Sequence, residues 1–288
     1  MKKIYSLLKL LRPHQWVKNG FVFIGLFFGQ AWNNSELVIK AILIFIAFCL
    51  ASSCVYVFND MVDRERDRFH PKKRNRGIAS GEISLTQAAI LLIVVGISGF
   101  VIALHVGIPV GDILAIYVIL NLAYSLYLKN VVILDVFIIA AGFMLRILAG
   151  TLGLGIPPSQ WLLVCGLMFT LFLGFSKRRA ELFLDDGVNH RQVLDDYSPS
   201  LLDHMMAVTG AAVIVSYALY TVSDDTIVLH KTRHLIVTIP FVLYGLFRYM
   251  FKVYRGRGGD DISLELVSDP HILVAFISWF LVTLYLIA

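Results

Sequence analysis

Long apolar stretches alternate with short polar segments along almost the whole chain. A search for runs on the scale of a membrane-spanning helix, roughly 17–25 residues, finds nine candidates. The pattern therefore predicts an all-α fold, a polytopic membrane helical bundle with nine transmembrane helices in one domain over residues 1–288. The candidate spans lie near residues 17–31, 37–58, 86–105, 110–127, 131–153, 159–176, 204–222, 235–251 and 271–288.

Composition excludes the common soluble classes. The 288 residues are 58% hydrophobic and 16% charged, with a mean hydropathy of +0.77, whereas soluble domains are about 45–50% apolar and about 25% charged. Three cysteines, all within apolar runs, do not form a disulfide framework or a metal-ligand spacing. Nine spans leave no soluble domain to present a groove, so nucleic acid is not an expected partner despite the net charge of +5.

Basic residues predict the orientation in the membrane. With a cytoplasmic N-terminus, 21 of the 25 Lys and Arg residues fall on the inner side, and three (Lys40, Lys231 and Arg233) fall outside. Arg146 lies within a span. Because inner segments carry the excess of Lys and Arg, we expect a multi-pass protein of the cell (inner or plasma) membrane with its C-terminus on the far side.

Acidic residues gather at the inner end of the second span. On one continuous helix, Asn59, Asp60, Asp63 and Asp67 lie within an arc of about 100°. Carboxylates on one face repel each other, and Mg²⁺ is a suitable counter-ion, since it is typically held by one or two carboxylates together with substrate phosphates. The alternative is a solvated helix end whose acids pair with the arginines at 64, 66 and 68.

A second polar cluster follows the sixth span. Lys177, Arg178, Glu181 and Asp185 repeat the offsets of the first cluster and share an arc of about 100° if the helix continues. Cations at the first two positions suit anions directly. We expect the two clusters to face one cavity that holds a diphosphate and a second anionic group; a basic flank that merely orients the span is the alternative.

The motif Asn59-Asp60-x-x-Asp63-x-x-x-Asp67, at the end of the second of nine spans, resembles the UbiA superfamily of intramembrane prenyltransferases. The resemblance covers nearly the whole chain. It implies a helical bundle whose cytoplasmic-side cavity holds two Asp-rich motifs, Mg²⁺ and a diphosphate substrate. Lys177 departs from the pattern, because relatives that use prenyl diphosphates carry aspartate there.

Four features instead resemble the branch that includes decaprenyl-phosphate phosphoribosyltransferase. That branch transfers phosphoribose from phosphoribosyl diphosphate to a polyprenyl phosphate, and the resemblance implies a lipid-linked arabinose donor for the cell envelope. The features are Arg12-Pro13-His14-Gln15-Trp16-Val17-Lys18-Asn19; His70-Pro71-x-Lys73-Arg74-x-Arg76 with Ala79-x-Gly81; Tyr124-Ser125 through Leu128-Lys129 with Leu134-Asp135; and Lys177-Arg178-x-x-Glu181.

The resemblance gives the candidate residues their roles. Asp60, Asp63 and Asp67 are expected to hold Mg²⁺ on the leaving diphosphate and so to be catalytic. Asn59 is expected to supply an oxygen or an amide donor, while Tyr124 and Glu181 hold ribose hydroxyls or orient lysines. The remaining candidate ligands of the two phosphate groups are Lys18, Lys73, Arg74, Lys129, Lys177 and Arg178.

Two charges within the spans need partners. Asp135, about one turn inside the fifth span, is costly unless paired, and Lys129 or a metal-bound substrate is the expected partner. Arg146 is either functional or paired with Asp112. For the pair Asp260–Asp261, a solvated loop and a lid remain open.

Two other functions remain open. An aromatic-acceptor polyprenyltransferase is favoured if Lys177 and Arg178 play no part. An anion transporter is the third candidate, although the charges gather at one membrane face rather than at the midplane where transport sites lie. The sequence also leaves the oligomeric state open, including a homo-oligomer.

Overall fold

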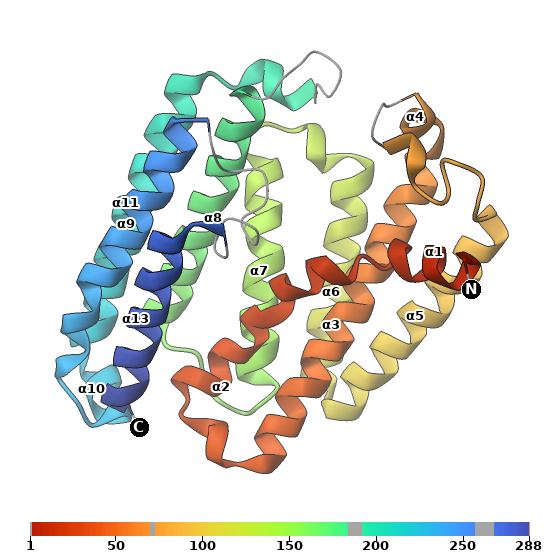
Figure 1. Ribbon diagram of the computed structural model, residues 1–288. Coiled ribbons are helices and arrows are strands. Elements are labelled where there is room, and N and C mark those ends of the chain that lie inside the picture. Colours follow the sequence, from red (N-terminus) through yellow and green to blue (C-terminus); the bar gives the residue numbers. More distant parts are fainter. Residues whose placement is uncertain (1, 70–72, 184–191, 257–267, 288) are drawn as a thin grey trace. The chain divides into compact units, whose positions relative to one another are not determined.

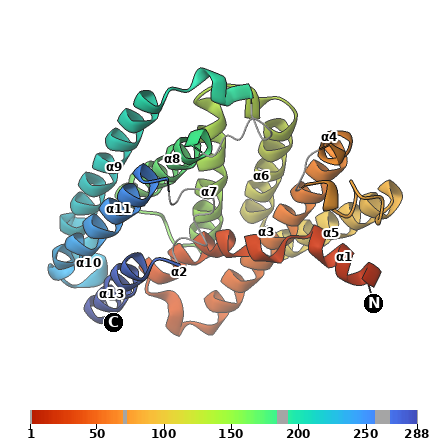
Figure 2. The same cartoon turned by 45° about the horizontal axis from the view of Figure 1, so that its top comes forward.

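The computed structural model describes residues 2–69, 73–183, 192–256 and 268–287, which form helices and no strand (Figures 1 and 2). The α-helices are α1 (Lys2–Leu10), α2 (Ile24–Phe28), α3 (Ser35–Val62), α4 (Arg64–Arg68), α5 (Leu85–Val106), α6 (Ile108–Leu126), α7 (Leu134–Leu152), α8 (Gln160–Phe183), α9 (Pro199–Val222), α10 (Asp224–His230), α11 (Ile239–Tyr254) and α13 (Pro270–Ile287). The 3₁₀ helices are η1 (Pro13–Phe23), η2 (Ala31–Asn33), η3 (Lys73–Asn75), η4 (Leu128–Asn130), η5 (Gln192–Asp196) and η6 (His234–Thr238).

Within these residues, eight helices are long and apolar enough to cross a membrane. They are α3, α5, α6, α7, α8, α9, η6 with α11, and α13. They correspond to the last eight of the nine predicted spans. The all-α fold and the multi-pass membrane class are therefore confirmed, whereas the count of nine membrane-spanning helices is not.

The first predicted span, 17–31, takes a different form. It is covered by the 3₁₀ helix η1 and the short α2, not by one long α-helix. Arg12, just before η1, contacts Asp60 in the last turn of α3, and Asn34, just after η2, caps the first turn of the same helix. Residues 13–33 therefore cover the distance between the two ends of α3.

The chain divides into two compact units, and the division falls within α7. Unit 1 comprises residues 1–128 and 145–157, and unit 2 comprises residues 129–144 and 158–288.

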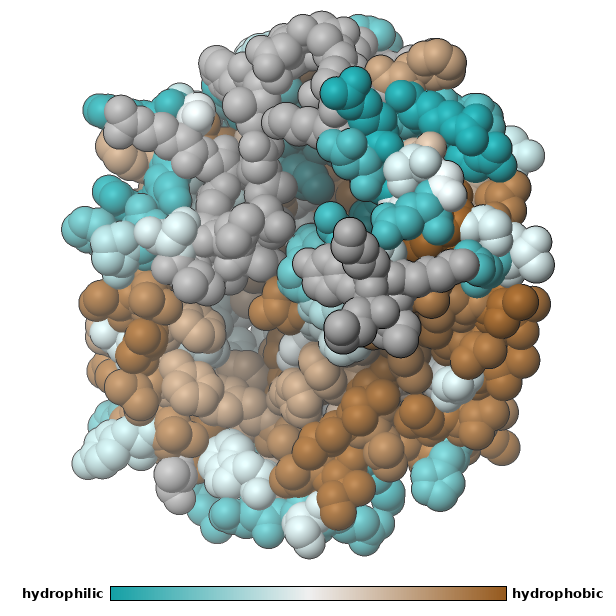
Figure 3. All heavy atoms as spheres, turned by 45° about the vertical axis from the view of Figure 1, so that its right-hand side comes forward, coloured by the Kyte–Doolittle hydropathy of each residue, from teal (hydrophilic) through white to brown (hydrophobic). Residues whose placement is uncertain are grey.

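Unit 1 is built around α3, which packs along α5, α6 and η1. Its core includes Phe48, Ile44 and Leu114, which are almost wholly buried. The caps follow from sequence: Asn34 accepts hydrogen bonds from the backbone N–H groups of Glu36 and Leu37, and Ser84 forms a capping box with Gln87 at the start of α5. In Figure 3, hydrophilic side chains gather at the end of this unit that carries α4, above an apolar surface.

Close backbone packing fastens η1 and α2 to the second half of α7. A Cβ atom at Gly150 would collide with the carbonyl of Val22, and one at Gly25 would collide with the carbonyl of Gly150. Only glycine permits this approach of two backbones.

Unit 2 is built from α8 packed along α9, and α11 packed along α13. Phe172, Leu202 and Met206 are completely buried in its core. Ser198 caps α9 by accepting a hydrogen bond from the N–H of Leu201. The first half of α7 packs into this core through Val136 and Ala140.

Candidate active site

The acidic motif lies at the end of α3 in unit 1. Asn59 and Asp60 occupy the last turn, the helix ends at Val62, and Asp63 is the cap residue between α3 and α4. The expected single helix through Asp67 is therefore interrupted. The i→i+4 hydrogen bonds nevertheless continue across the junction, since the N–H of Asp63 bonds to the carbonyl of Asn59 at 2.9 Å and that of Asp67 to the carbonyl of Asp63 at 2.8 Å.

Two arginines from other segments neutralise this motif. Arg12 Nη2 lies 2.6 Å from Asp60 Oδ1. Arg76 Nη1 lies 3.0 Å from the same oxygen and 2.7 Å from Asp67 Oδ2, so one guanidinium joins two carboxylates. Asp60 and Asp67 are each only 3% exposed, and a buried carboxylate without a partner would be costly.

The alternative interpretation paired the acids of the motif with neighbouring arginines, but two of these arginines bind a different carboxylate. Arg64 and Arg68 both bind Glu65, an exposed residue outside the motif. The sequence analysis did not select Arg12 and Arg76 as site residues, although both stand in the motifs that carry the family resemblance. Their place in these motifs was the sequence signal that could have identified both arginines.

Asn59 carries a buried oxygen that points to a missing partner. Within the described part of the chain, its Oδ1 has no hydrogen-bond partner. Among the residues that the structure describes, no group of three or more His, Cys, Asp or Glu side chains is arranged to hold a metal ion by itself. The Asn59 oxygen is of the type that hard cations such as Mg²⁺ take as a ligand, and such ions commonly complete their coordination with substrate phosphates and water.

A cavity of about 510 Å³ opens beside Asp60. Three cations line it, Lys9, Arg12 and Arg76, against two acids, Asp60 and Glu82. The volume lies in the range of about 300–1,000 Å³ that is typical of small-molecule sites. Its net positive lining favours an anionic ligand.

Arg12 is held in a defined position at the edge of this cavity. It follows α1, precedes Pro13 and adopts a left-handed φ of 50°. Its guanidinium lies 4.9 Å from the ring centroid of Tyr56, in a cation–π contact. The ion pair with Asp60 and this stacking together stabilise a backbone conformation that is unfavourable for a side chain other than glycine.

The second cluster lies at the end of α8 in unit 2, and Arg178 is its centre. Arg178 is 1% exposed and donates from Nε to Asp135 Oδ2 at 2.6 Å and from Nη1 to Glu181. The expected partner of Asp135 was Lys129 or a bound substrate, and this expectation is corrected: the partner is Arg178. Arg178 is thus part of a buried hydrogen-bond network with Asp135 and Glu181.

Tyr197 completes that network. Its hydroxyl donates to Asp135 Oδ1 at 2.8 Å and accepts from the N–H of Ile133 at 2.7 Å. Burial, together with the hydrogen bond to Asp135, raises the pKa of Tyr197, so the phenol remains protonated and keeps donating. Ile133 has a left-handed φ of 67°, which is strained for a β-branched residue. No sequence signal pointed to Tyr197.

The other predicted residues are distributed over several elements. Asp63 and Lys73 are partly buried, and Arg74 is exposed. Lys18 lies in η1, Tyr124 in α6 and Lys129 in η4. Lys177, next to Arg178, is partly buried. Asp185 and the pair Asp260–Asp261 lie outside the described residues.

Arg146 belongs to a buried polar cluster within unit 1. Its Nε donates to Asn19 Oδ1 at 2.7 Å and its Nη2 to the Tyr117 hydroxyl at 2.8 Å. Its guanidinium also stacks on Tyr117, 4.7 Å from the ring centroid. The suggested pair with Asp112 is wrong, because Asp112 is exposed and these neutral groups take its place. Arg146 thereby helps to anchor η1.

Comparison with known proteins agrees with this fold and this motif. The model of the UbiA prenyltransferase family matches residues 20–181. Decaprenyl-phosphate phosphoribosyltransferase of Mycolicibacterium smegmatis is 32% identical over 96% of this chain and 90% of its own length. The protein with the same name from Corynebacterium glutamicum is 34% identical over 95% of this chain and 84% of its own.

The solved structures show the same architecture. A UbiA homologue from Archaeoglobus fulgidus, bound to GPP and Mg²⁺, is similar with a TM-score of 0.72 at 17% identity, over 97% of this chain and 99% of that one. At this identity the likeness concerns the fold alone.

The fold and the acidic motif thus define a polytopic, all-helical membrane protein with a charged site at the end of one helix. The chain belongs to the UbiA prenyltransferase family.

Proposed function

We propose that this protein transfers the 5-phosphoribosyl group from phosphoribosyl diphosphate to a polyprenyl phosphate of the decaprenyl type. The products are diphosphate and polyprenyl-phosphoryl-5-phosphoribose, a precursor of a lipid-linked pentose donor, arabinose, for the cell envelope. The observation that carries the proposal is the match, over almost the whole chain, to relatives named decaprenyl-phosphate phosphoribosyltransferase. The enzyme is thus a pentosyltransferase, in which both units form one catalytic domain.

The cavity beside Asp60 supports an anionic donor. Phosphoribosyl diphosphate carries phosphate groups at both ends, and the lining cations Lys9, Arg12 and Arg76 suit phosphate oxygens. Arginine in particular binds phosphate through two parallel N–H donors. Lys18, Lys73 and Arg74 are further ligands in this proposal.

The acidic motif supports a magnesium-dependent reaction. Asp60, Asp63 and Asp67 would be the ligands, and the buried Oδ1 of Asn59 is suited to bind the ion or the diphosphate. Mg²⁺ supplies neutralisation of the charge that develops on the departing diphosphate. Arg12 and Arg76 hold two of the three carboxylates in place.

The acceptor phosphate is itself the nucleophile. A phosphate monoester is largely dianionic near neutral pH, since its second pKa is about 6, so the reaction needs no strong general base. One of its oxygens bonds to carbon 1 of the ribose while the carbon–oxygen bond to diphosphate breaks, with inversion and with oxocarbenium character at carbon 1. The proton balance is unchanged by this step.

Residues of unit 2 would contact the acceptor or the ribose. Lys177 and Lys129 are the proposed phosphate ligands. Arg178 is buried between Asp135 and Glu181, so we assign it the role of positioning these carboxylates, which accept hydrogen bonds from hydroxyl groups. Tyr124 of unit 1 is a further candidate for the ribose. The excess of basic residues places the reaction on the cytoplasmic side of the cell membrane in this proposal.

A transfer assay with isolated membranes tests the proposal. Radiolabelled phosphoribosyl diphosphate and polyprenyl phosphate, with Mg²⁺, should yield label in the lipid fraction, and chelation of Mg²⁺ should abolish it. If label never enters the lipid while a labelled prenyl diphosphate is transferred to an aromatic acid, the protein is an aromatic-acceptor prenyltransferase instead.

Asp63→Ala sharpens this assay. The residue is partly exposed at a helix junction, so its loss should abolish turnover and leave expression near normal. Asp112→Ala, which removes an exposed acid elsewhere in unit 1, is the matched control and should retain activity. Unfolding of Asp63→Ala in detergent would assign Asp63 a structural role.

A further inference from the structure

A groove between α11 and α13 lies on unit 2. It has a volume of about 420 Å³. Its lining is mainly apolar and includes Phe241 and Tyr244 of α11 and Val274 and Ser278 of α13. Tyr244 is 48% and Val274 62% exposed, so the described residues of unit 2 leave the groove open. Both helices belong to membrane-spanning segments, and an apolar groove on such helices suits a lipid chain.

One end of this groove carries positive charge. Phe241, Tyr244, Arg248 and Lys252 follow at intervals of three, four and four residues and therefore share one face of α11. The same face thus changes from apolar to cationic towards the C-terminal end of the helix. Arg248 lies seven residues, or about 10 Å, from Phe241.

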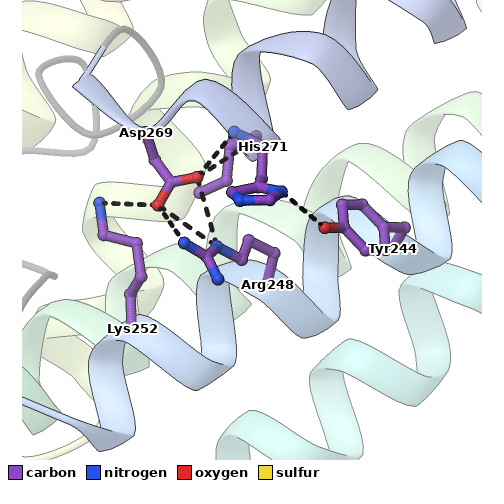
Figure 4. A network of polar contacts seen from close by, with 6 residues as sticks. Tyr244, Arg248, Lys252, Asp269 and His271 are labelled. Atoms are coloured by element: carbon purple, nitrogen blue, oxygen red, sulfur yellow. Dashed lines mark hydrogen bonds and ion pairs between the residues drawn. The ribbon is translucent and has the colours of Figure 1, made fainter.

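The cations at that end are only partly neutralised. Arg248 donates to Asp269 from Nη2 at 3.0 Å and from Nε at 3.3 Å, which leaves Nη1 outside this contact (Figure 4). Lys252 Nζ lies 3.8 Å from Asp269 Oδ2, too far for a hydrogen bond. Among the described residues at this end, two cations therefore face one carboxylate.

Asp269 is also committed to the start of α13. Its Oδ1 accepts hydrogen bonds from the backbone N–H groups of His271 at 3.0 Å and Ile272 at 3.1 Å (Figure 4). It therefore functions as a helix cap and holds Arg248 at the groove. His271 in turn bonds through Nδ1 to the Tyr244 hydroxyl at 3.0 Å, which places two amphipathic rings at the boundary between the charged end and the apolar groove.

We propose that this groove binds an anionic phospholipid of the bilayer. The phosphodiester lies at Arg248 and Lys252, and one acyl chain lies along Tyr244, Val274 and Ser278. A phosphodiester carries one negative charge, which matches the single excess positive charge of Arg248, Lys252 and Asp269. Basic pockets between transmembrane helices bind anionic headgroups in this way, and tyrosine suits the interface between headgroup and hydrocarbon. The site is independent of the transferase reaction.

Thermal unfolding of the full-length protein in detergent tests the proposal. Phosphatidylglycerol should raise the unfolding temperature in a saturable manner, because a ligand that binds only the folded state stabilises it, whereas phosphatidylcholine should not. Lys252→Met should raise the half-saturating mole fraction of phosphatidylglycerol about five-fold, which corresponds to about 1 kcal/mol for one basic residue. Ser278→Phe, which fills the groove but leaves the cations intact, should also weaken the response.

Lys231→Met, which removes an exposed lysine at the end of α10, is the matched control and should respond like the unmodified protein. Equal stabilisation by both phospholipids, or an equal response of the two lysine variants, would overturn the proposal. Displacement of bound phosphatidylglycerol by an equimolar polyprenyl phosphate would assign the groove to the acceptor lipid and would overturn it as well.

Discussion

At the scale of single residues, Arg76 determines the state of the acidic motif. Asp60 and Asp67 lie seven positions apart, are both buried, and both contact the one guanidinium nitrogen Nη1. Two carboxylates so arranged would repel each other and would each lose solvation. The Arg76 guanidinium between them, together with Arg12 on Asp60, offsets these penalties. Arg76 thus prepares the motif for a phosphate-bearing ligand.

Arg76→Met should therefore reduce transfer activity at least ten-fold and lower the free energy of unfolding by about 1–3 kcal/mol, the cost of leaving buried acceptors without a donor. Labelled-lipid formation and thermal unfolding measure the two effects. Arg66→Met is the control, because Arg66 is exposed on α4 within the same region. The assigned role is wrong if both variants behave alike.

Asp269 gives unit 2 a defined dependence on pH. Burial opposes ionisation of its carboxyl group, but the hydrogen bonds from Arg248 and from the N–H of Ile272 outweigh it and lower the pKa. A carboxyl whose pKa is lower in the folded state stabilises that state above its unfolded pKa, about 3.9, and this stabilisation is lost as pH falls through the folded pKa.

Asp269→Asn should thus destabilise the protein at pH 7, by about 1–2 kcal/mol for a lost charged cap and ion pair. The difference from the unmodified protein should shrink as pH falls below the unfolded pKa of about 3.9 and through the lower pKa of the native carboxyl. Unfolding temperatures from pH 3 to pH 8 measure this, with Asp225→Asn, an exposed acid of α10, as control. A difference that stays constant with pH would contradict the argument.

At the scale of elements, the long helices could be predicted and the first segment could not. Uninterrupted apolar runs of about 20 residues have few alternatives to a helix in a bilayer, so the eight longer stretches lie where the pattern placed them. Residues 17–31 have the same composition, but Gly25, Gly150 and Arg146 hold them against α7 by contacts that a pattern along the chain does not reveal.

The candidate site likewise has one part that could be predicted from the sequence and one part that could not. The spacing along the chain predicted that the carboxylates cluster, because they all lie in one short helical stretch. Arg12 and Arg76 come from 48 and 16 residues away from Asp60, and Tyr197 reaches Asp135 across 62 residues. Such partners depend on tertiary packing. The expectation that Arg178 faces a ligand directly missed its burial for the same reason.

Gly150→Ala tests the anchoring of the first segment. The added Cβ would collide with the Val22 carbonyl, and such overpacking costs about 1–3 kcal/mol. Gly245→Ala is a matched control within α11, where the nearest atom to a new Cβ is 4.0 Å away; it should be neutral or stabilising by up to about 1 kcal/mol. Thermal unfolding compares them, and equal effects would refute close packing at Gly150.

At the scale of the whole molecule, the number of crossings determines where the termini lie. η1 with 11 residues and α2 with five extend roughly 30 Å at about 2.0 Å and 1.5 Å per residue, which equals the hydrocarbon thickness of about 30 Å. The segment is therefore long enough to cross in a form other than one α-helix. Nine crossings place the termini on opposite sides, and eight place them on the same side.

Labelling of single cysteines in intact cells distinguishes the two cases. In a variant without Cys49, Cys54 and Cys165, we expect a membrane-impermeant maleimide to label Lys231→Cys, and to spare Arg74→Cys and Lys3→Cys until the cells are permeabilised. Labelling of Arg74→Cys from outside would reverse the predicted orientation. Labelling of Lys3→Cys from outside, with Arg74→Cys still protected, would favour eight crossings, in which residues 17–31 do not span the membrane.

Sequence spacing predicts that the acidic cluster of unit 1 and the cationic cluster of unit 2 bind one substrate. The energetic consequence is measurable. If the donor contacts Asp63 and Lys177 at the same time, their contributions to transition-state binding are coupled, and the loss in kcat/KM for Asp63→Asn with Lys177→Met should be smaller than the product of the single losses. Asp63→Asn with Lys231→Met should be multiplicative, since Lys231 lies at the end of α10. A multiplicative result for both pairs would mean that the clusters act independently, and the cationic end of α8 would then serve only to orient its span.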